Sequence, residues 1–220
     1  MLLLSCAAWA QVSGSITIDS DYRFRGVSLS DSKPSLRLDA NLDTRSGWYA
    51  GAAATQARTP GGDPYAQLLG YAGYVRPIAA GRSLEFGANY SHFVHQGPYD
   101  FAEAYAGLLS DSWTLRLNYS PNYFGRHVQT LYLDASGHWR LGERARLFGH
   151  AGLLAPVAGG YPGDSDANRP RADILMGMGW GLGDADLRVA WTFASAGGPI
   201  PAVAPPQHRG AWLFSASYSF

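Results

Sequence analysis

The sequence predicts an all-β protein, a transmembrane antiparallel β-barrel of about twelve strands. Three observations support this class: apolar and polar residues alternate in segment after segment, short turns alternate with longer loops, and the chain ends in an aromatic strand. Alternation places every second side chain on the same face of a strand. A membrane barrel shows this pattern because one face meets lipid and the other meets an aqueous interior.

Composition limits the class of protein further. The chain has 220 residues, enough for one barrel or one large sandwich. No apolar run approaches the roughly 18 residues that a membrane helix requires. The 27 glycines, 13 tyrosines and 7 tryptophans suit crowded strands that place small residues beside interfacial aromatic rings. The 17 basic and 17 acidic residues give a net charge of zero, so we expect no nucleic-acid partner.

The first ten residues resemble the end of a secretory signal peptide. Residues 2–10 are mostly apolar, and residues 8–10 have the small-x-small pattern of a cleavage site. The segment is short and has no basic start, so we expect a truncated signal peptide over 1–10 and a single mature domain over 11–220. A lipoprotein signal ending at Cys6 is the alternative. Cys6 is the one cysteine, which excludes disulfides within the mature chain.

The first strand is predicted from an alternation that begins at Ile16. Ile18, Tyr22 and Phe24 follow on the same parity, opposite a set of polar and charged residues. The strand is expected to break near Gly26, because glycine inside a strand pattern marks a bend or a turn.

This first strand carries a short charged and aromatic motif. The motif consists of Ser20, Asp21, Tyr22, Arg23, Phe24, Arg25 and Gly26. It resembles the N-terminal signature of the TorF porin family of proteobacteria, and the resemblance also covers the chain length and the terminal strand. The resemblance implies an outer-membrane barrel whose transported substrates are largely unknown. Two interpretations of the charged motif residues stay open: they gate or bind a solute, or they form a salt-bridged rim around the first loop.

Eleven further strands follow from the same alternation. Short turns are expected near residues 45, 79, 111, 142 and 184, with mostly longer loops between the other strands. An even strand number with short turns on one side is typical of bacterial outer-membrane barrels. The loops 155–170 and 196–209 are candidates for an inward constriction, with ordinary surface loops as the alternative. The predicted strands are 34–43, 48–57, 65–76, 83–93, 101–109, 113–123, 128–140, 144–154, 171–182, 185–195 and 210–220.

The terminal strand alternates large aromatic residues with small polar ones. It resembles the closing strand of outer-membrane barrels, which implies recognition by the barrel assembly machinery through Phe220. Tryptophans also begin or end strands beside the predicted short turns, as expected at a membrane interface. A soluble sandwich with an aromatic core is the alternative, disfavoured because a charged face recurs on strand after strand. The predicted membrane-interface aromatics are Trp48, Trp113, Trp139, Trp180, Trp212 and Phe220.

One face of the predicted strands collects charged side chains. Placing Arg or Lys at the lipid-facing midplane costs about 2–4 kcal/mol, so these side chains are expected to point inward. They predict either a polar conduit with cationic and anionic walls or a salt-bridge network that fills a narrow barrel. The predicted pore-lining residues are Arg37, Asp39, Glu85, Glu103, Arg116, Asp134, His138, Arg146, Arg171, Asp173, Asp186 and Arg188.

Glycines also recur with a period of two, at positions 177, 179, 181 and 183. No strand followed by a helix frames them, which disfavours a nucleotide-binding loop. In a strand they remove side chains from one face and leave room for a bulky neighbour, an infolded loop or a passing solute.

These observations predict a porin-like channel in the bacterial outer membrane, for passive diffusion of small hydrophilic solutes. Outer-membrane lipids and lipopolysaccharide are the expected surroundings; we expect no cofactor, no metal and no enzymatic activity. A closed structural or adhesive barrel that binds an extracellular partner through its loops is the alternative. A lipid hydrolase is the third candidate, since His92 is expected to face lipid near the outer rim. The neighbouring strands offer no outward serine there, and no G-x-S-x-G motif occurs.

Overall fold

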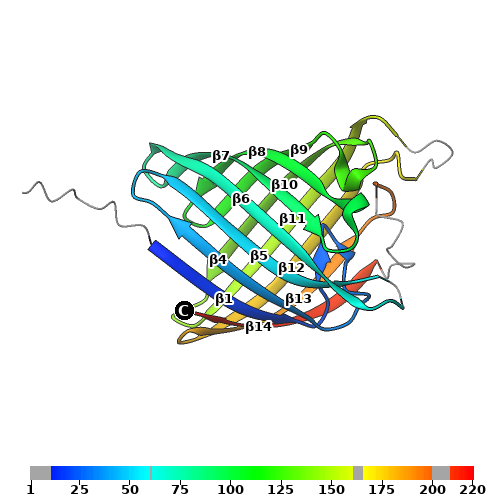
Figure 1. Ribbon diagram of the computed structural model, residues 1–220. Coiled ribbons are helices and arrows are strands. Elements are labelled where there is room, and N and C mark those ends of the chain that lie inside the picture. The colour runs from blue at the N-terminus through cyan, green and yellow to red at the C-terminus, as the bar shows by residue number, and fades with distance from the viewer. Residues whose placement is uncertain (1–10, 60, 161–165, 200–208) are drawn as a thin grey trace, which may run out of the picture.

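Twelve antiparallel strands close into a barrel in the computed structural model, which describes residues 11–59, 61–160, 166–199 and 209–220 (Figure 1). Each wall strand pairs with its neighbours along the chain, which confirms the predicted fold class. The predicted signal peptide, 1–10, lies outside the described residues. The wall strands are β1 (Gln11–Asp19), β4 (Ser35–Asp43), β5 (Trp48–Arg58), β6 (Pro64–Ala79), β7 (Arg82–Phe93), β8 (Phe101–Ser110), β9 (Trp113–Ser120), β10 (Gln129–Arg140), β11 (Ala145–Ala158), β12 (Arg171–Leu182), β13 (Ala185–Ala194) and β14 (Gly210–Ser219).

The first and last wall strands form the seam that closes the ring. Ile16 of β1 is opposite Tyr218 of β14. Gly14 and Phe220 exchange two backbone hydrogen bonds, each with an N···O distance of 2.9 Å. A closed ring leaves no strand edge to be satisfied in hydrocarbon, which is the condition for a sheet to span a membrane.

Side chains alternate strictly between the outside and the inside of the wall. Leu36 and Leu38 on β4 are 43% and 46% exposed on the outer surface, whereas Arg37 between them lines the interior. Aliphatic and aromatic side chains are exposed in the same way on the other strands. Such an exterior is stable against lipid and unfavourable in water.

The two ends of the barrel differ in their connections. One end, the turn end, carries the short turns, and both the first described residue and the C-terminus lie there (Figure 1). Gly81 and Gly183 in these turns have φ values of +66°, a region in which an L side chain is strained. The opposite end, the loop end, carries the longer connections and the two short 3₁₀ helices, η1 (Gly97–Tyr99) and η2 (Tyr123–Gly125).

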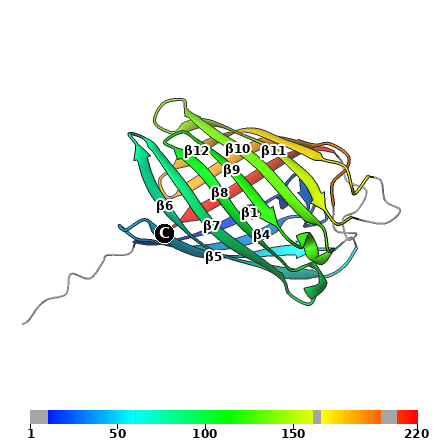
Figure 2. The same cartoon turned by 90° about the horizontal axis from the view of Figure 1, so that it is seen from above.

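The most consequential departure from the predicted strands lies in the first connection. The prediction that Tyr22 and Phe24 continue the first strand is wrong, because β1 ends at Asp19 and residues 20–34 leave the wall. They form an internal hairpin, with β2 (Arg23–Phe24) paired to β3 (Val27–Ser28) inside the barrel (Figure 2).

The turn of this internal hairpin consists of Arg25 and Gly26, with φ values of +50° and +74°. Two successive residues with positive φ are the requirement of the tight type I′ hairpin turn. The predicted break near Gly26 is therefore a reversal of the chain.

Smaller differences concern where strands stop. β9 ends at Ser120, three residues earlier than predicted, because Pro121 has no N–H for the ladder, and Tyr123 then turns inward in η2. β11 continues four residues further than predicted, to Ala158, so the following loop is shorter.

The apolar core of the molecule lies inside the loop end. Val27 and Leu29 of the internal hairpin are 6% and 4% exposed, and they pack against inward side chains of the wall and of η2. The loop end is therefore filled much as a soluble domain is. The other members of this core are Phe93, Phe101, Tyr123, Phe124, Tyr132 and Leu154.

Candidate functional site

Two adjoining polar cavities occupy the barrel interior. The first has a volume of about 890 Å³, lies at the turn end and is lined by residues such as Ser112, Glu143 and Arg146. The second has a volume of about 570 Å³ and lies beneath the internal hairpin. His150 and Arg188 line both cavities, so the two spaces meet at this point. The candidate site is this polar lumen together with the hairpin that ends it.

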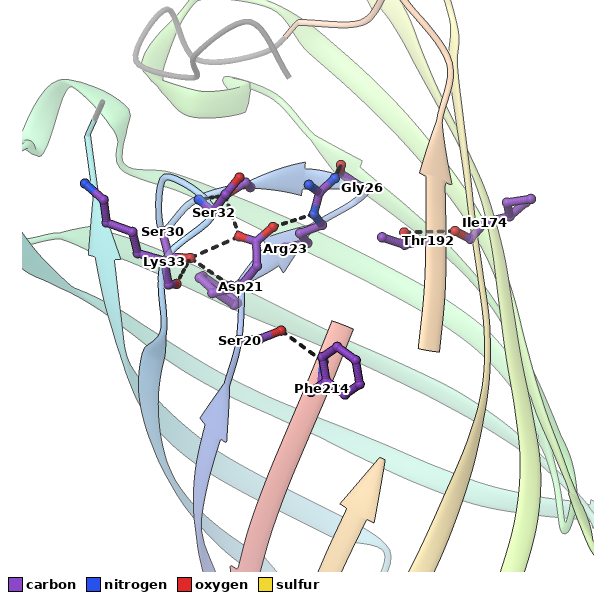
Figure 3. Close-up of polar contacts among 12 residues, drawn as sticks. Ser20, Asp21, Arg23, Gly26, Ser30, Ser32, Lys33, Ile174, Thr192 and Phe214 are labelled. Carbon is purple, nitrogen blue, oxygen red and sulfur yellow. Dashed lines mark hydrogen bonds and ion pairs between the residues drawn. The ribbon is translucent and has the colours of Figure 1, made fainter. Parts of the chain in front are cut away.

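Asp21 holds the internal hairpin in its folded form. Its carboxylate accepts hydrogen bonds from Arg23 Nε at 2.7 Å, Ser28 Oγ at 2.5 Å and Ser30 Oγ at 3.1 Å (Figure 3). The side chains of Arg23 and Asp21 are only 4% and 7% exposed. A buried carboxylate with several charge-assisted partners fixes the local backbone strongly.

Arg25 connects the hairpin tip to the wall. Its Nη2 donates to Glu103 Oε2 on β8 at 2.8 Å, and both side chains are more than nine-tenths buried. The guanidinium carbon lies 4.0 Å from the centre of the Tyr132 ring on β10 and 5.4 Å from that of Tyr123. Ion pairing and cation–π contacts together offset the desolvation of this buried charge.

Further contacts seat the hairpin across the mouth of the barrel. Leu29 accepts a backbone hydrogen bond from Arg58 on β5 at 2.8 Å. Tyr22 Oη donates to Gln67 on β6 at 3.0 Å. Gly26 lies so close to β13 that an added Cβ would be 2.6 Å from Ala194 Cβ. These contacts reach opposite sides of the wall, so the hairpin extends across the lumen at the loop end.

Aromatic rings stabilise the same region. The ring centroids of Phe101 and Phe124 are 4.7 Å apart, those of Phe93 and Phe124 are 5.6 Å apart, and Phe24 of the hairpin lies 6.1 Å from Phe101. Burial of each such side chain stabilises the fold by about 1.5–3 kcal/mol. The hairpin is therefore held by apolar contacts as well as by charges.

A second polar network braces the wall below the hairpin. Arg116 on β9 donates to Glu85 Oε2 from Nη2 at 2.7 Å and from Nε at 3.0 Å. Tyr49 Oη donates to Glu85 Oε1 at 2.5 Å and lies 2.7 Å from Tyr105 Oη. These contacts cross β5, β7, β8 and β9 on the lumen side.

Charges near the turn end are more open to water. Asp186 binds Arg146 with an N···O distance of 2.6 Å and Arg188 at 2.7 Å, and the Arg188 side chain is 48% exposed. The glycine column on β12 provides the space for this arrangement. A Cβ at Gly179 would lie 3.0 Å from Arg146 Cζ, and one at Gly177 would lie 2.6 Å from Phe148 Cζ. The column thus accommodates bulky neighbours, one of its expected uses.

A hydrogen-bonded chain joins three neighbouring strands where the two cavities meet. Ser136 Oγ on β10 lies 2.9 Å from His150 Nδ1 on β11. His150 Nε2 lies 3.1 Å from Asp173 Oδ1 on β12 and 2.9 Å from Tyr132 Oη. Asp173 is among the predicted pore-lining residues, whereas His150 is not. The available signal was that all three residues share the inward parity on consecutive strands.

All twelve predicted pore-lining residues lie on the inward face, in different surroundings. Arg171 is 4% exposed and packs beneath the hairpin, and Glu103 is held by Arg25. Asp134 accepts from Asn118 at 3.0 Å. His138 lines the larger cavity. The remaining predicted residues take part in the pairs Arg37–Asp39, Glu85–Arg116 and Arg146–Asp186–Arg188 and in the contact of Asp173 with His150.

The predicted interface aromatics all lie exposed on the outer surface. The exposed fractions of Trp48, Trp139 and Phe220 at the turn end are 60%, 65% and 72%. Trp113 and Trp180 lie at the same end, and Trp212 lies towards the loop end. A role for these rings at the membrane interface stays a prediction.

His92 faces outward, and its partner is a carboxylate. His92 Nδ1 lies 2.6 Å from Asp100 Oδ2, which also accepts from Tyr90 Oη at 3.1 Å, and Asp100 Oδ1 accepts from the Phe93 amide at 2.8 Å. Partial burial would raise the pKa of the Asp100 carboxyl, but the hydrogen bonds from His92, the Phe93 amide and Tyr90 hold it below its usual value. The cluster fastens the β7–β8 connection to the end of β7.

A second partly buried carboxylate fastens the return of the internal hairpin. Asp31 Oδ2 lies 2.9 Å from Lys33 Nζ and accepts from the Gly61 amide at 3.4 Å. The hydrogen bonds from Lys33 and Gly61 lower the pKa of the Asp31 carboxyl.

The two long loops that were candidates for a constriction are described only in part. Residues 161–165 of one loop and 200–208 of the other lie outside the described residues. In the described portions, the Gly198 amide donates to the carbonyls of Asp166 and Arg169, which joins the two loops. The inward constriction that the structure describes is formed by residues 20–34 of the first connection.

Proteins of known structure share this architecture at low sequence identity. The NanC porin matches with a TM-score of 0.64 and 9% identity, and the KdgM porin with 0.58 and 11%. LpxR from Salmonella typhimurium matches with a TM-score of 0.57 and 9% identity. Each comparison covers 94% of this chain and 99% of the other. At this identity the likeness shows the fold. The closed barrel with its apolar exterior confirms the predicted location in the bacterial outer membrane.

No helix in the described ranges has the length and hydropathy needed to cross a membrane. None of the curated proteins matches the sequence. One family model does match, over residues 5–154. Because this match spans more than half of the chain, the protein belongs to the family described as "Bacterial protein of unknown function (Gcw_chp)".

Proposed function

We propose that this protein is an outer-membrane channel for passive diffusion of small hydrophilic solutes, and that the internal hairpin gates it. The observation that carries this proposal is the polar lumen, in which cavities of about 890 Å³ and 570 Å³ adjoin and are lined by charged side chains. An interior kept hollow and polar over this length is suited to water and polar solutes. Diffusion through it requires no cofactor and no catalytic step.

Two likenesses support a channel. The motif at residues 20–26 resembles the signature of the TorF porin family, and two proteins with the same fold are named as porins, KdgM and NanC. We propose the finer assignment to TorF-type porins on the strength of the motif. Its residues supply the gate: Asp21 shapes the hairpin, and Arg25 fastens it to Glu103.

Passage through the channel requires displacement of the hairpin, because its contacts extend across the mouth. Of the two interpretations of the charged motif residues, this arrangement favours a gate over a rim. The salt bridges lie within the mouth, and Arg25 and Glu103 are almost fully buried.

The structure allows the hairpin to be removed without changing the wall. Asp19 and Ser35 are register partners in β1 and β4, so a four-residue Gly/Ser turn in place of residues 20–34 would join the two strands directly. Single-channel conductance in planar bilayers would be measured for the wild type, this deletion and the control Arg169→Ala, whose side chain is 73% exposed outside the hairpin.

The proposal expects a low or intermittent conductance for the wild type, a large and steady one for the deletion, and no change for the control. Equal conductance in the wild type and the deletion would show that the hairpin is no barrier. No conductance from a deletion variant that has folded would refute the channel itself. Folding would be checked by circular dichroism and by heat-dependent migration in gels.

A closed structural or adhesive barrel is the second candidate. The apolar core at the loop end favours it, because packing of that kind also suits a permanent seal. A non-conducting deletion variant would leave this candidate in place. Contacts with outer-membrane lipids and lipopolysaccharide, and recognition of the β14 end at Phe220 by the assembly machinery, are part of either proposal.

A further inference from the structure

The lumen contains a serine, a histidine and an aspartate in hydrogen-bonded series. Ser136 Oγ is 2.9 Å from His150 Nδ1, and His150 Nε2 is 3.1 Å from Asp173 Oδ1. We propose that these three residues form a catalytic triad and that the barrel hydrolyses small water-soluble esters that enter its lumen. This activity goes beyond conduction and does not depend on whether the hairpin opens.

The hydrogen-bond partners select the protonation state that such chemistry needs. The carboxylate of Asp173 only accepts hydrogen bonds, so His150 carries its proton on Nε2 and donates it towards Asp173. The Tyr132 hydroxyl lies 2.9 Å from the same nitrogen and donates to Asp173, at 3.2 Å from Oδ2. Nδ1 of His150 is then unprotonated and carries a lone pair, to which the Ser136 hydroxyl donates its hydrogen bond. The imidazole is therefore a base placed against the hydroxyl of a serine.

The burial of the acid and of the serine matches the role proposed for each. Asp173 is 4% exposed and screened from water, whereas Ser136 is only half-buried and lines the cavity of about 890 Å³. A buried acid orients the histidine and stabilises its cationic form, while an accessible serine can meet a substrate. A Cβ at Gly152 would collide with the Tyr132 hydroxyl, so glycine at that position allows the tyrosine to reach the histidine and the acid.

The reaction balances with water as the only co-substrate. Ser136 Oγ attacks the ester carbonyl as its proton passes to His150 Nδ1. The bond between the carbonyl carbon and the alcohol oxygen breaks, and the leaving alcohol takes that proton. Water, deprotonated by His150, then attacks the acyl-serine, releasing a carboxylic acid and restoring the Ser136 hydroxyl. Asp173 acts as the positioning residue.

The surroundings restrict the class of substrate. Ser136 faces the aqueous lumen on the inner side of β10, so acyl chains in the bilayer do not reach it. The cavity is lined by serines, arginines and histidines. It suits a short acyl group on a polar alcohol, in contrast to the lipid substrate considered for the outward His92.

The test combines turnover with covalent labelling. Purified protein in detergent would be assayed with p-nitrophenyl acetate and labelled with a fluorophosphonate, and the labelled residue located by mass spectrometry. The variants are Ser136→Ala, His150→Gln and the matched control Ser217→Ala, an inward, half-buried serine on β14 distant in the sheet from the triad.

We expect phosphonylation at Ser136, a loss of about 100-fold or more in turnover for Ser136→Ala and His150→Gln, and unchanged turnover for Ser217→Ala. Asp173→Asn would lower kcat and shift the pH profile of kcat, a change that a merely structural role would not cause. Turnover by folded Ser136→Ala at the wild-type rate, or a label on any other residue, would overturn the proposal. So would an Asp173→Asn profile that keeps the wild-type pH dependence.

Discussion

The two halves of the barrel interior are built on different principles. At the loop end the Arg25–Glu103 pair has side chains 7% and 4% exposed within an apolar core, whereas towards the turn end the Arg188–Asp186 pair has side chains 48% and 18% exposed. The first half is packed like a soluble domain, and the second is solvated. The same residue types therefore stabilise the fold to very different extents, depending on which half they occupy.

The largest effect is expected from breaking the buried pair. Glu103→Ala leaves the Arg25 guanidinium buried without its carboxylate and should lower the free energy of unfolding by about 3–5 kcal/mol. Arg188→Ala removes a solvated partner near the turn end and should cost about 0–1 kcal/mol. Urea unfolding in lipid vesicles, followed by tryptophan fluorescence, measures both. Equal losses in the two variants would contradict the distinction between the halves.

A smaller loss of stability is expected when either of two glycines with similar backbone geometry is replaced by alanine. Gly26 has φ +74° and no room for a Cβ, whereas Gly183 has φ +66° and nothing within 4 Å of an added Cβ. Gly183→Ala should cost about 1–2 kcal/mol from backbone strain alone, and Gly26→Ala about 2–4 kcal/mol because the collision adds to that strain. The same unfolding assay applies. If Gly183→Ala proved the more damaging, the hairpin would be less tightly seated than its contacts indicate.

Ion selectivity tests the solvated half on its own. The near-equal numbers of inward cations and anions predict weak selectivity in the wild type. Arg188→Glu replaces a half-exposed lumen cation with an anion and should shift the reversal potential towards cation preference. Arg169→Glu makes the same change of charge outside the lumen and should have little effect. An unchanged reversal potential in Arg188→Glu would place that residue off the conducting path.

The smallest expected effect is the pH dependence of local stability at the loop end. The pKa of Asp100 is lowered in the folded protein, so its contribution to stability is present above the unfolded value of about 3.9 and is lost as pH falls through the folded value. Protection factors for amide hydrogen exchange in the β7–β8 connection should therefore fall below about pH 4. Asp100→Asn should show low protection factors already at neutral pH. An acid-insensitive connection in the wild type would argue against the Asp100 contacts.

Much of the wall could be predicted because each strand repeats one local rule. Leu36, Arg37 and Leu38 alternate between lipid and lumen, and that alternation alone fixes which side chain faces inward. The internal hairpin could not be found in this way. Tyr22 and Phe24 keep the strand parity in the sequence, yet the hydrogen bonds of Asp21 with Ser28 and Ser30 draw the chain out of the wall. These partners are several residues apart in the sequence, so the two-residue alternation of a strand does not predict their contacts.

The triad was missed for a related reason. Ser136, His150 and Asp173 lie on three different strands, and their contacts depend on the register between those strands. Ser136 is opposite His150 in one pair of strands, whereas Asp173 is opposite Gly152, two residues further along β11. Parity predicts that all three side chains point inward, but only the register brings them within hydrogen-bonding distance.

The position of the hairpin directly after β1 has a consequence for biogenesis. β1 meets β14 only when the last strand has been added, and the hairpin touches β5, β6, β8, β10, β12 and β13. Its docking surface is therefore complete only in a finished ring. Resistance of the peptide bonds after Arg23 and Arg25 to trypsin would then distinguish molecules with a closed barrel from those whose insertion is incomplete.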